Sequence, residues 1–166
     1  NENAVYSYFA KKEFDYCINC AAYTNVEQAE TTSNLALKVN AEAVKYLALA
    51  CKKEKVTLIH ISTDYVFDGE KTTPSTEDDF TNPINVYGKS KLKGENYIFE
   101  SLEEAFVIRT SWLYSSFGKN FVKTIVSKIN EDADLKVTTA EKGTPTSCID
   151  LANTIYSIIT LKNVPY

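Results

Sequence analysis

The sequence predicts an α/β protein built on a parallel sheet flanked by helices. Short β-rich apolar runs alternate with stretches of helical periodicity along the 166 residues, an order typical of βαβ units. The run at 56–61 shows no polar alternation, which indicates a strand covered on both faces. Hydrophobic residues make up 44% of the chain and charged residues 24%, a balance that can form a packed core.

The first half of the chain is predicted to contain two helices, two strands and a long loop. The helices are expected over 2–12 and 31–54, and the strands over 15–20 and 56–61. A polar stretch with Gly and Pro follows over 68–85. A loop of that length inside a compact domain is usually functional.

The second half continues the alternation. Ser147 and Asp150 have the spacing of a capping box that opens a helix. The predicted elements are, in order, a helix over 86–102, a strand over 105–110, a helix over 119–130, a strand over 135–139 and a helix over 147–160.

Charge and hydropathy exclude several function classes. With 18 basic and 22 acidic side chains the net charge is −4, which argues against a nucleic-acid-binding surface. No apolar run is long enough to cross a membrane, and residues 1–6 do not resemble a signal peptide. Because Met is absent, we expect the chain to be an excerpt of a longer protein.

The cysteines are interpreted as structural thiols. Cys17 and Cys20 form a C-x-x-C, but inside a strand an offset of three places them on opposite faces. There is no second such pair, and the single histidine, His60, lies within another predicted strand. We therefore expect buried, unpaired cysteines, no metal site, and a reducing, cytoplasmic compartment.

Polar and aromatic residues follow three of the predicted strands. They occupy 21–24, 62–69 and 111–114. Each cluster alone could merely turn the chain or cap a helix. Because parallel sheets bind ligands beyond the carboxyl ends of their strands, three clusters at equivalent ends predict a ligand site.

Tyr87 and Lys91 are four residues apart on a predicted helix and so share a face. An ammonium beside a phenol lowers the phenol's pKa and makes it a usable proton donor and acceptor. The spacing is not specific by itself, because Tyr8 and Lys12 repeat it. The surrounding motifs decide its meaning.

Those motifs closely resemble the extended short-chain dehydrogenase/reductases and, within them, the dTDP-4-dehydrorhamnose reductase family. The resemblance rests on Ser-Thr-Asp-Tyr-Val-Phe-Asp-Gly at 62–69, on Pro-Ile-Asn-Val-Tyr-Gly-Lys-Ser-Lys at 83–91, and on Gly94-Glu95. Further blocks occur in the family's order, at 19–24, 29–30, 40–41, 109–114, 118–121 and 143–146. The fold it implies is a Rossmann-like sheet, and the whole chain is expected to be one partial NAD(P)-binding domain.

The resemblance also implies a role for each site residue. Tyr87 would donate a proton to the 4-keto oxygen of the sugar, Lys91 would hold the nicotinamide ribose and tune Tyr87, and Thr63 would hydrogen-bond the carbonyl. Asp64 and Trp112 would line the sugar-nucleotide site. The residues expected along the cofactor are Ala22, Tyr23, Thr24, Ile61, Tyr87 and Lys91.

The implied reaction is the NADPH- or NADH-dependent reduction of dTDP-4-dehydro-6-deoxy-L-mannose to dTDP-L-rhamnose for surface polysaccharide. The resemblance allows a homodimer and, in full-length members, Mg²⁺, although no residue here is assigned to a metal. Two alternatives stay open. One is a sugar-nucleotide epimerase or dehydratase of the same superfamily, and the other is a non-catalytic relative that regulates a partner enzyme.

Two departures from the family pattern bear on activity. The five glycines, at 69, 88, 94, 118 and 143, form no Gly-rich turn for a dinucleotide pyrophosphate. We therefore expect the 166 residues by themselves to be inactive and to bind the cofactor weakly. In addition, Ala140-Glu141-Lys142 stands where the family usually has Asp-Gln, so the contacts of that loop are expected to differ.

Overall fold

A computed structural model describes residues 1–131 and 143–161. The chain divides into two compact units, Asn1–Arg109 and Thr110–Pro165. The first carries most of the predicted site residues. Within the described residues no helix is long and apolar enough to span a membrane.

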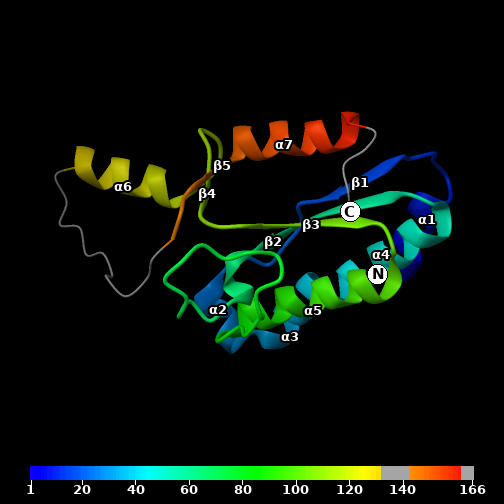
Figure 1. Cartoon of the computed structure of the whole chain (residues 1–166), viewed down its shortest axis with the longest axis horizontal. Helices are drawn as coiled ribbons and strands as arrows, with labels where there is room; N and C mark the ends of the chain where they lie inside the picture. Colours follow the sequence, from blue (N-terminus) through cyan, green and yellow to red (C-terminus); the bar gives the residue numbers. More distant parts are fainter. Residues whose placement is uncertain (132–142, 162–166) are drawn as a thin grey trace. The chain divides into compact units, whose positions relative to one another are not determined.

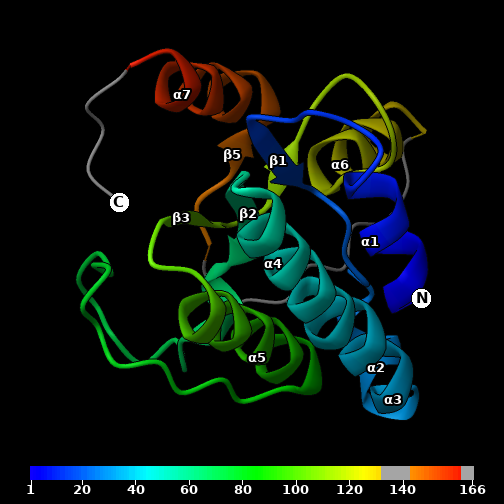
Figure 2. The same cartoon turned by 90° about the vertical axis from the view of Figure 1, so that its right-hand side faces the viewer.

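A three-stranded sheet forms the centre of the first unit. Its strands are β1 (Tyr16–Asn19), β2 (Thr57–Thr63) and β3 (Ala105–Thr110), in the order β1-β2-β3. β1 and β2 run parallel, with Asn19 opposite His60. The helices of this unit lie on the same side of the sheet (Figures 1 and 2). The predicted parallel sheet flanked by helices is therefore confirmed.

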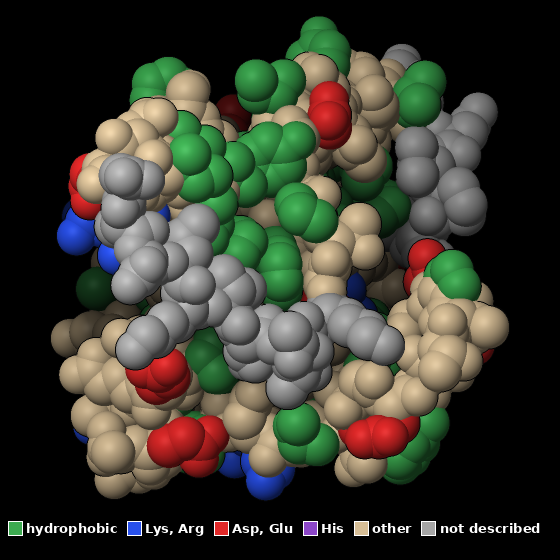
Figure 3. All heavy atoms as spheres, turned by 90° about the vertical axis from the view of Figure 1, so that its left-hand side faces the viewer, with side chains coloured by type: hydrophobic (Ala, Val, Ile, Leu, Met, Phe, Trp, Pro, Cys, Tyr) green, Lys and Arg blue, Asp and Glu red, His purple; other side chains and the backbone are tan. Residues whose placement is uncertain are grey.

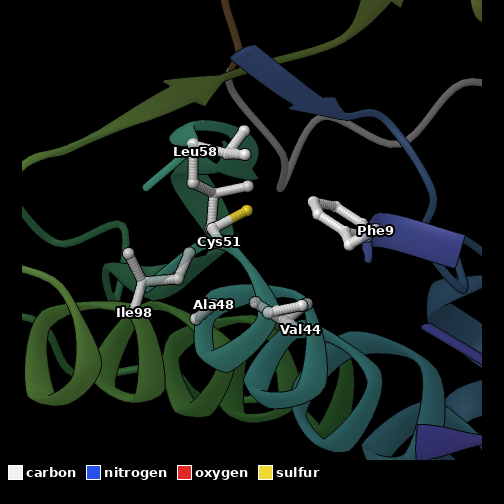
Figure 4. Close-up of a cluster of buried hydrophobic side chains, with 8 residues drawn as sticks. Phe9, Val44, Ala48, Cys51, Leu58 and Ile98 are labelled. Carbon is white, nitrogen blue, oxygen red and sulfur yellow. The ribbon is translucent and has the colours of Figure 1, made fainter. Parts of the chain in front are cut away.

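The core of this unit lies between the sheet and three helices, α1 (Glu2–Phe9), α4 (Ala43–Glu54) and α5 (Val86–Ser101). Figure 4 shows the side chains that meet there, among them Phe9, Val44, Cys51, Leu58 and Ile98. All five are buried. Burying a large aliphatic or aromatic side chain contributes about 1.5–3 kcal/mol, so this cluster holds the helices against β2.

The helix predicted over 31–54 is interrupted. It consists of α3 (Ser33–Leu37), a π-helical turn η1 (Lys38–Glu42) and α4, and a further helix α2 (Val26–Thr31), which the sequence did not predict, precedes it. Asn25 caps α2 by accepting a hydrogen bond from Gln28 N. Because π-helical turns are rare and often occur at functional sites, we expect η1 to lie near the site.

The other predicted elements of this unit agree closely with the structure. β2 ends at Thr63, two residues beyond the predicted strand, and leads into a short 3₁₀ turn η2 (Asp64–Val66). Residues 67–85 contain no helix or strand, as predicted for the loop. Asn85 Oδ1 accepts a hydrogen bond from Gly88 N at 2.7 Å and so fixes the start of α5.

The second unit contains two short parallel strands, β4 (Leu113–Tyr114) and β5 (Thr146–Ser147), and two helices, α6 (Phe121–Asn130) and α7 (Cys148–Thr160). Ser147 caps α7 by accepting from Asp150 N, which is one of the two hydrogen bonds of the predicted capping box, and the helix begins where that box places it. The sequence did not predict β4 or β5. The strand predicted over 135–139 lies outside the described residues.

The burial predicted for the cysteines is wrong in part. All four are free, but only Cys51 is fully buried, whereas Cys20 is exposed. The physical reason is that β1 ends at Asn19, so Cys20 lies beyond the strand.

Exposed apolar side chains occur in both units, among them Ile18 and Phe80 in the first and Ile149 and Tyr156 in the second. Hydrophobic side chains at the surface are coloured green in Figure 3.

Candidate active site

Lys91 is a buried cation at the carboxyl end of β2, the central strand of the first unit's sheet. It lies one turn after Tyr87 on α5, and only 1% of its surface is exposed. Its ammonium nitrogen Nζ donates a hydrogen bond to the Ile61 carbonyl at 2.7 Å and lies 3.3 Å from His60 Nε2. The structure thus brings together Lys91 and Ile61, two of the predicted site residues, at the carboxyl end of β2.

Tyr87 faces the end of β2. The Thr63 hydroxyl lies close enough to the phenol to lower its pKa, and the Tyr65 ring meets the Tyr87 ring edge-on, with centroids 5.6 Å apart. Thr63 Oγ1 also donates to Asp64 Oδ1 at 3.2 Å. The predicted residues Thr63, Asp64 and Tyr87 therefore form one group in which a hydroxyl lies beside a phenol.

The predicted lowering of the Tyr87 pKa is wrong. Burial raises the pKa of the phenol, and the interaction with the Thr63 hydroxyl opposes that effect without cancelling it. The negative charge of Asp64 raises the pKa further. Lys91 does not lower it, because its Nζ is directed to Ile61 and His60. Tyr87 is therefore a neutral phenol, in the form that donates a proton.

Gly88 explains why the two motifs can approach each other. A Cβ on Gly88 would lie 2.1 Å from the Tyr65 carbonyl oxygen, a distance that no side chain tolerates. Only glycine lets the first turn of α5 pack directly against the backbone of η2. The Tyr-Gly-Lys sequence at 87–89 thus places Tyr87 next to the Thr63 end of β2.

Asn40, in the π-helical turn, holds the segment that follows β1. Its Oδ1 accepts from Tyr23 N at 2.8 Å, and its Nδ2 donates to Tyr23 O at 3.0 Å and to Ser90 Oγ at 2.9 Å. Ser90 Oγ in turn donates to the Tyr87 carbonyl at 2.7 Å. One buried side chain thus connects Tyr23, predicted to lie along a cofactor, with the helix that carries Tyr87 and Lys91.

The position of Asn40 depends on a second glycine of α5. A Cβ on Gly94 would lie 2.2 Å from the Asn40 carbonyl oxygen, so α5 and η1 are in backbone contact there. The neighbouring predicted residues Ala22 and Thr24 are half-buried and exposed, respectively. Together, Gly94 and η1 set the distance between α5 and the 21–24 segment.

His60 and Asn19 form a buried pair behind Lys91. Asn19 Nδ2 lies 2.9 Å from His60 Nδ1, and Asn19 Oδ1 accepts from Ala21 N at 3.1 Å. Burial, together with the charge of Lys91, lowers the pKa of His60 to about 3. Burial also lowers the pKa of Lys91 to about 8, although the Glu95 carboxylate acts in the opposite direction. His60 is therefore neutral and Lys91 is close to titration at physiological pH.

Trp112 belongs to the second unit. It has a positive φ of 46°, and its ring lies 5.0 Å from that of Phe121. A Cβ on Gly143 would lie 2.5 Å from the indole, so the ring rests on glycine backbone. Its assignment to the substrate site remains a prediction.

Sequence reasoning missed the residues that support the site. Asn19, Asn40, His60 and Ser90 are all buried. The last three each contact a predicted site residue or its backbone, and Asn19 contacts His60. A polar residue on the inner face of a predicted helix or strand is the signal that could have identified them, since buried polar groups need partners. In residues 1–131 and 143–161, no group of three or more His, Cys, Asp or Glu side chains is arranged to hold a metal ion.

Comparison with known proteins agrees with this geometry. Residues 1–164 match the family described as RmlD substrate binding domain. A dTDP-4-dehydrorhamnose reductase of Sinorhizobium fredii is 42% identical over 144 residues, which cover 87% of this chain and 49% of that protein. The chain therefore spans about half the length of the curated relatives it matches.

Two solved structures are similar throughout the chain. The crystal structure of a dTDP-4-dehydrorhamnose reductase from Clostridium acetobutylicum has a TM-score of 0.93 and 43% identity, covering 99% of this chain and 59% of that one. The crystal structure of a dTDP-4-dehydrorhamnose reductase from Bacillus anthracis, in complex with NADP, has a TM-score of 0.93 and 37% identity. It covers 97% of this chain and 57% of that one. Both similarities extend over the two units.

Proposed function

The chain belongs to the family of the RmlD substrate binding domain, and from that premise we propose that it carries the catalytic region of an NAD(P)H-dependent dTDP-4-dehydrorhamnose reductase. The reaction would reduce the 4-keto group of dTDP-4-dehydro-6-deoxy-L-mannose to give dTDP-L-rhamnose for surface polysaccharide. One observation carries this proposal. The Tyr87 phenol lies close enough to the Thr63 hydroxyl, at the carboxyl end of β2, for that hydroxyl to lower its pKa, and Lys91 lies one turn after Tyr87.

A ketone needs a proton on its oxygen as a hydride reaches its carbon. Tyr87 is suited to supply that proton because burial keeps its phenol neutral. Thr63 is suited to donate a hydrogen bond to the same oxygen and to stabilise the alkoxide that develops there. Asp64, in contact with Thr63, and Trp112 would contact the sugar nucleotide.

The residues present fit a nicotinamide cofactor. Ala21 and Ala22 have small side chains, and the backbone of their segment is held in place by hydrogen bonds to Asn19 and Asn40. A flat ring could approach the chain there, and Tyr23, Thr24 and Ile61 would complete its surroundings. Lys91 would hold the ribose. A bound nicotinamide supplies the hydride.

Either NADPH or NADH is proposed as the cofactor, and the cytoplasm as the compartment. The similar Bacillus anthracis enzyme was crystallised with NADP. The four free cysteines favour a reducing compartment. No metal is assigned to this chain.

The test is a direct assay of the intact protein. It would be incubated with dTDP-4-dehydro-6-deoxy-L-mannose and either NADPH or NADH, and the loss of reduced cofactor and the identity of the sugar product would be followed. We expect stoichiometric oxidation of the cofactor and dTDP-L-rhamnose. An isomerised or dehydrated sugar without net oxidation of cofactor would instead support an epimerase or dehydratase. Saturable binding of a partner enzyme without turnover would support a regulatory role.

A further inference from the structure

The amide of Asn19 has one orientation. Its Oδ1 accepts a hydrogen bond from the backbone N–H of Ala21 at 3.1 Å. The other end, Nδ2, therefore faces His60 Nδ1 at 2.9 Å. An amide nitrogen only donates, so Nδ1 of His60 must present its lone pair.

That contact determines where His60 carries its proton. The ring is fully buried and neutral, and a neutral imidazole has one N–H. With Nδ1 acting as acceptor, the proton resides on Nε2. This is the nitrogen that lies 3.3 Å from Lys91 Nζ.

The two charge states of Lys91 respond differently to this N–H. An ammonium group has only donors, so the His60 N–H and the ammonium would face each other as two donors. A neutral amine has a lone pair that can accept from Nε2–H. In either state Lys91 retains a hydrogen to donate to the Ile61 carbonyl at 2.7 Å.

We propose that Asn19 and His60 form a positioning pair that sets the charge state of Lys91, because Asn19 fixes an N–H on His60 Nε2 that favours the Lys91 amine over its ammonium. Its catalytic consequence rests on the function proposed above. Because the Lys91 ammonium is proposed to hold the cofactor ribose, loss of its charge would limit the reaction at alkaline pH, and the Asn19–His60 pair would set the pH at which that loss occurs.

Few other charged or titratable groups act on Lys91. Glu95, one turn later on α5, has a carboxylate that favours the ammonium and so opposes His60. Tyr87, one turn earlier, is a neutral phenol. Arg109, on β3, is bonded to Glu95. On β1, the Asn19 amide is uncharged and acts on Lys91 only through its contact with His60. The His60 tautomer can therefore shift the charge state of Lys91 without adding charge to the site.

The first experiment reads the tautomer directly. The intact protein would be labelled with ¹⁵N-histidine, and long-range ¹H–¹⁵N correlations would be recorded between about pH 5 and pH 8. The His60 signals would be assigned by their loss in His60→Gln. We expect the neutral Nε2–H form throughout. An Nδ1–H form, or an imidazolium that titrates near the ordinary histidine pKa, would overturn the proposal.

The second experiment changes the pair. Asn19→Asp is nearly isosteric, and its carboxylate would accept from both Ala21 N–H and His60 Nδ1–H, which moves the lone pair to Nε2. His60→Gln adds no charge and can turn its amide oxygen toward Lys91. In both variants Lys91 gains an acceptor, so its pKa, measured from the lysine ε-carbon resonance, should rise by about one unit.

The control is Cys51→Ala, a fully buried position outside this network. It should leave the His60 tautomer and the Lys91 pKa unchanged. A Lys91 pKa within a few tenths of a unit of wild type in a folded His60→Gln protein would overturn the proposal. If His60→Gln does not fold, the wild-type tautomer still decides, together with the His60 ring in Asn19→Asp, whose Nδ1 should then carry a proton.

The kinetic readout separates positioning from general damage. In the reductase assay, both variants should shift the alkaline limb of the profile of kcat against pH toward higher pH. KM for the sugar nucleotide should stay near the wild-type value. A loss of kcat by the same factor at every pH would contradict a role that acts through Lys91. If the protein reduces no dTDP-sugar at all, the proposed function fails, and the NMR results still test the pairing.

Discussion

Glu95 and Arg109 form a bidentate ion pair that ties α5 to β3. Arg109 Nη2 lies 2.7 Å from Glu95 Oε2, and Arg109 Nε lies 3.2 Å from both carboxylate oxygens. Glu95 has no exposed surface, and the Ser62 hydroxyl also donates to its carboxylate. The pair therefore joins the helix that carries Tyr87 and Lys91 to β3, and the Ser62 hydrogen bond joins the same carboxylate to β2, the strand that ends at Thr63.

Removal of the arginine should destabilise this arrangement strongly. Arg109→Met would leave a buried carboxylate without its cation, a change that costs about 3–5 kcal/mol of unfolding free energy. Urea denaturation would measure it. Lys71→Met, which breaks the exposed pair between Lys71 and Asp79, is the control and should change stability little. Equal effects of the two substitutions would show that burial of Glu95 does not matter.

The contact between α5 and the π-helical turn should not tolerate a methyl group. In Gly94→Ala the new Cβ would meet the Asn40 carbonyl oxygen, so α5 must shift. We expect a loss of about 1–3 kcal/mol, despite the better helix propensity of alanine. Asn96→Ala, at an exposed position of the same helix, controls for that propensity and should not destabilise. A Gly94→Ala protein as stable as wild type would refute the backbone contact.

Asn40 should determine how well the 21–24 segment receives a cofactor. Asn40→Asp keeps an acceptor for Tyr23 N–H but loses the donor to Tyr23 O and Ser90. We expect NAD(P)H to bind about tenfold more weakly and the Tyr23 amide to exchange faster with solvent. Calorimetric titration and hydrogen exchange would measure these. Asn34→Asp, which adds the same charge at an exposed position of α3, should bind normally; a similar loss there would implicate charge instead.

Stability should depend on pH through His60. Its pKa is about 3 in the folded chain, against 6.5 for the ordinary value. Below pH 6.5 the unfolded chain binds a proton that the folded chain excludes, so the contribution is complete above that pH and decreases as pH falls toward 3. Between about pH 7 and pH 5 the stability advantage of wild type over His60→Gln should shrink by about 2 kcal/mol in urea denaturation. An advantage that is constant with pH would show that His60 titrates normally.

The elements with strong local patterns could be predicted from the sequence. β3 spans the predicted 105–110 because an uninterrupted apolar run is specified by its own residues. α5 agrees because Asn85 supplies a local cap. The two-residue strands β4 and β5 are too short to form a pattern.

The supporting contacts could not be predicted in the same way. Asn40 contacts Ser90, fifty residues later in the chain, and its π-helical turn depends on a glycine of another helix. Family resemblance identified Thr63, Tyr87 and Lys91 as a group, but not the Asn19–His60 pair behind Lys91. The rise in the Tyr87 pKa likewise follows from burial, which spacing along a helix does not reveal.

The central claim is that Tyr87 supplies the proton for reduction of a dTDP-4-keto sugar, and Tyr87→Phe in the intact protein tests it most directly. Loss of the phenol should lower kcat by about 10²–10⁴-fold, while the dissociation constant of NAD(P)H stays close to the wild-type value because the ring is kept. Tyr97→Phe, on the same helix, is the matched control and should retain full activity. Near-wild-type turnover of dTDP-4-dehydro-6-deoxy-L-mannose by a folded Tyr87→Phe protein would contradict the assignment.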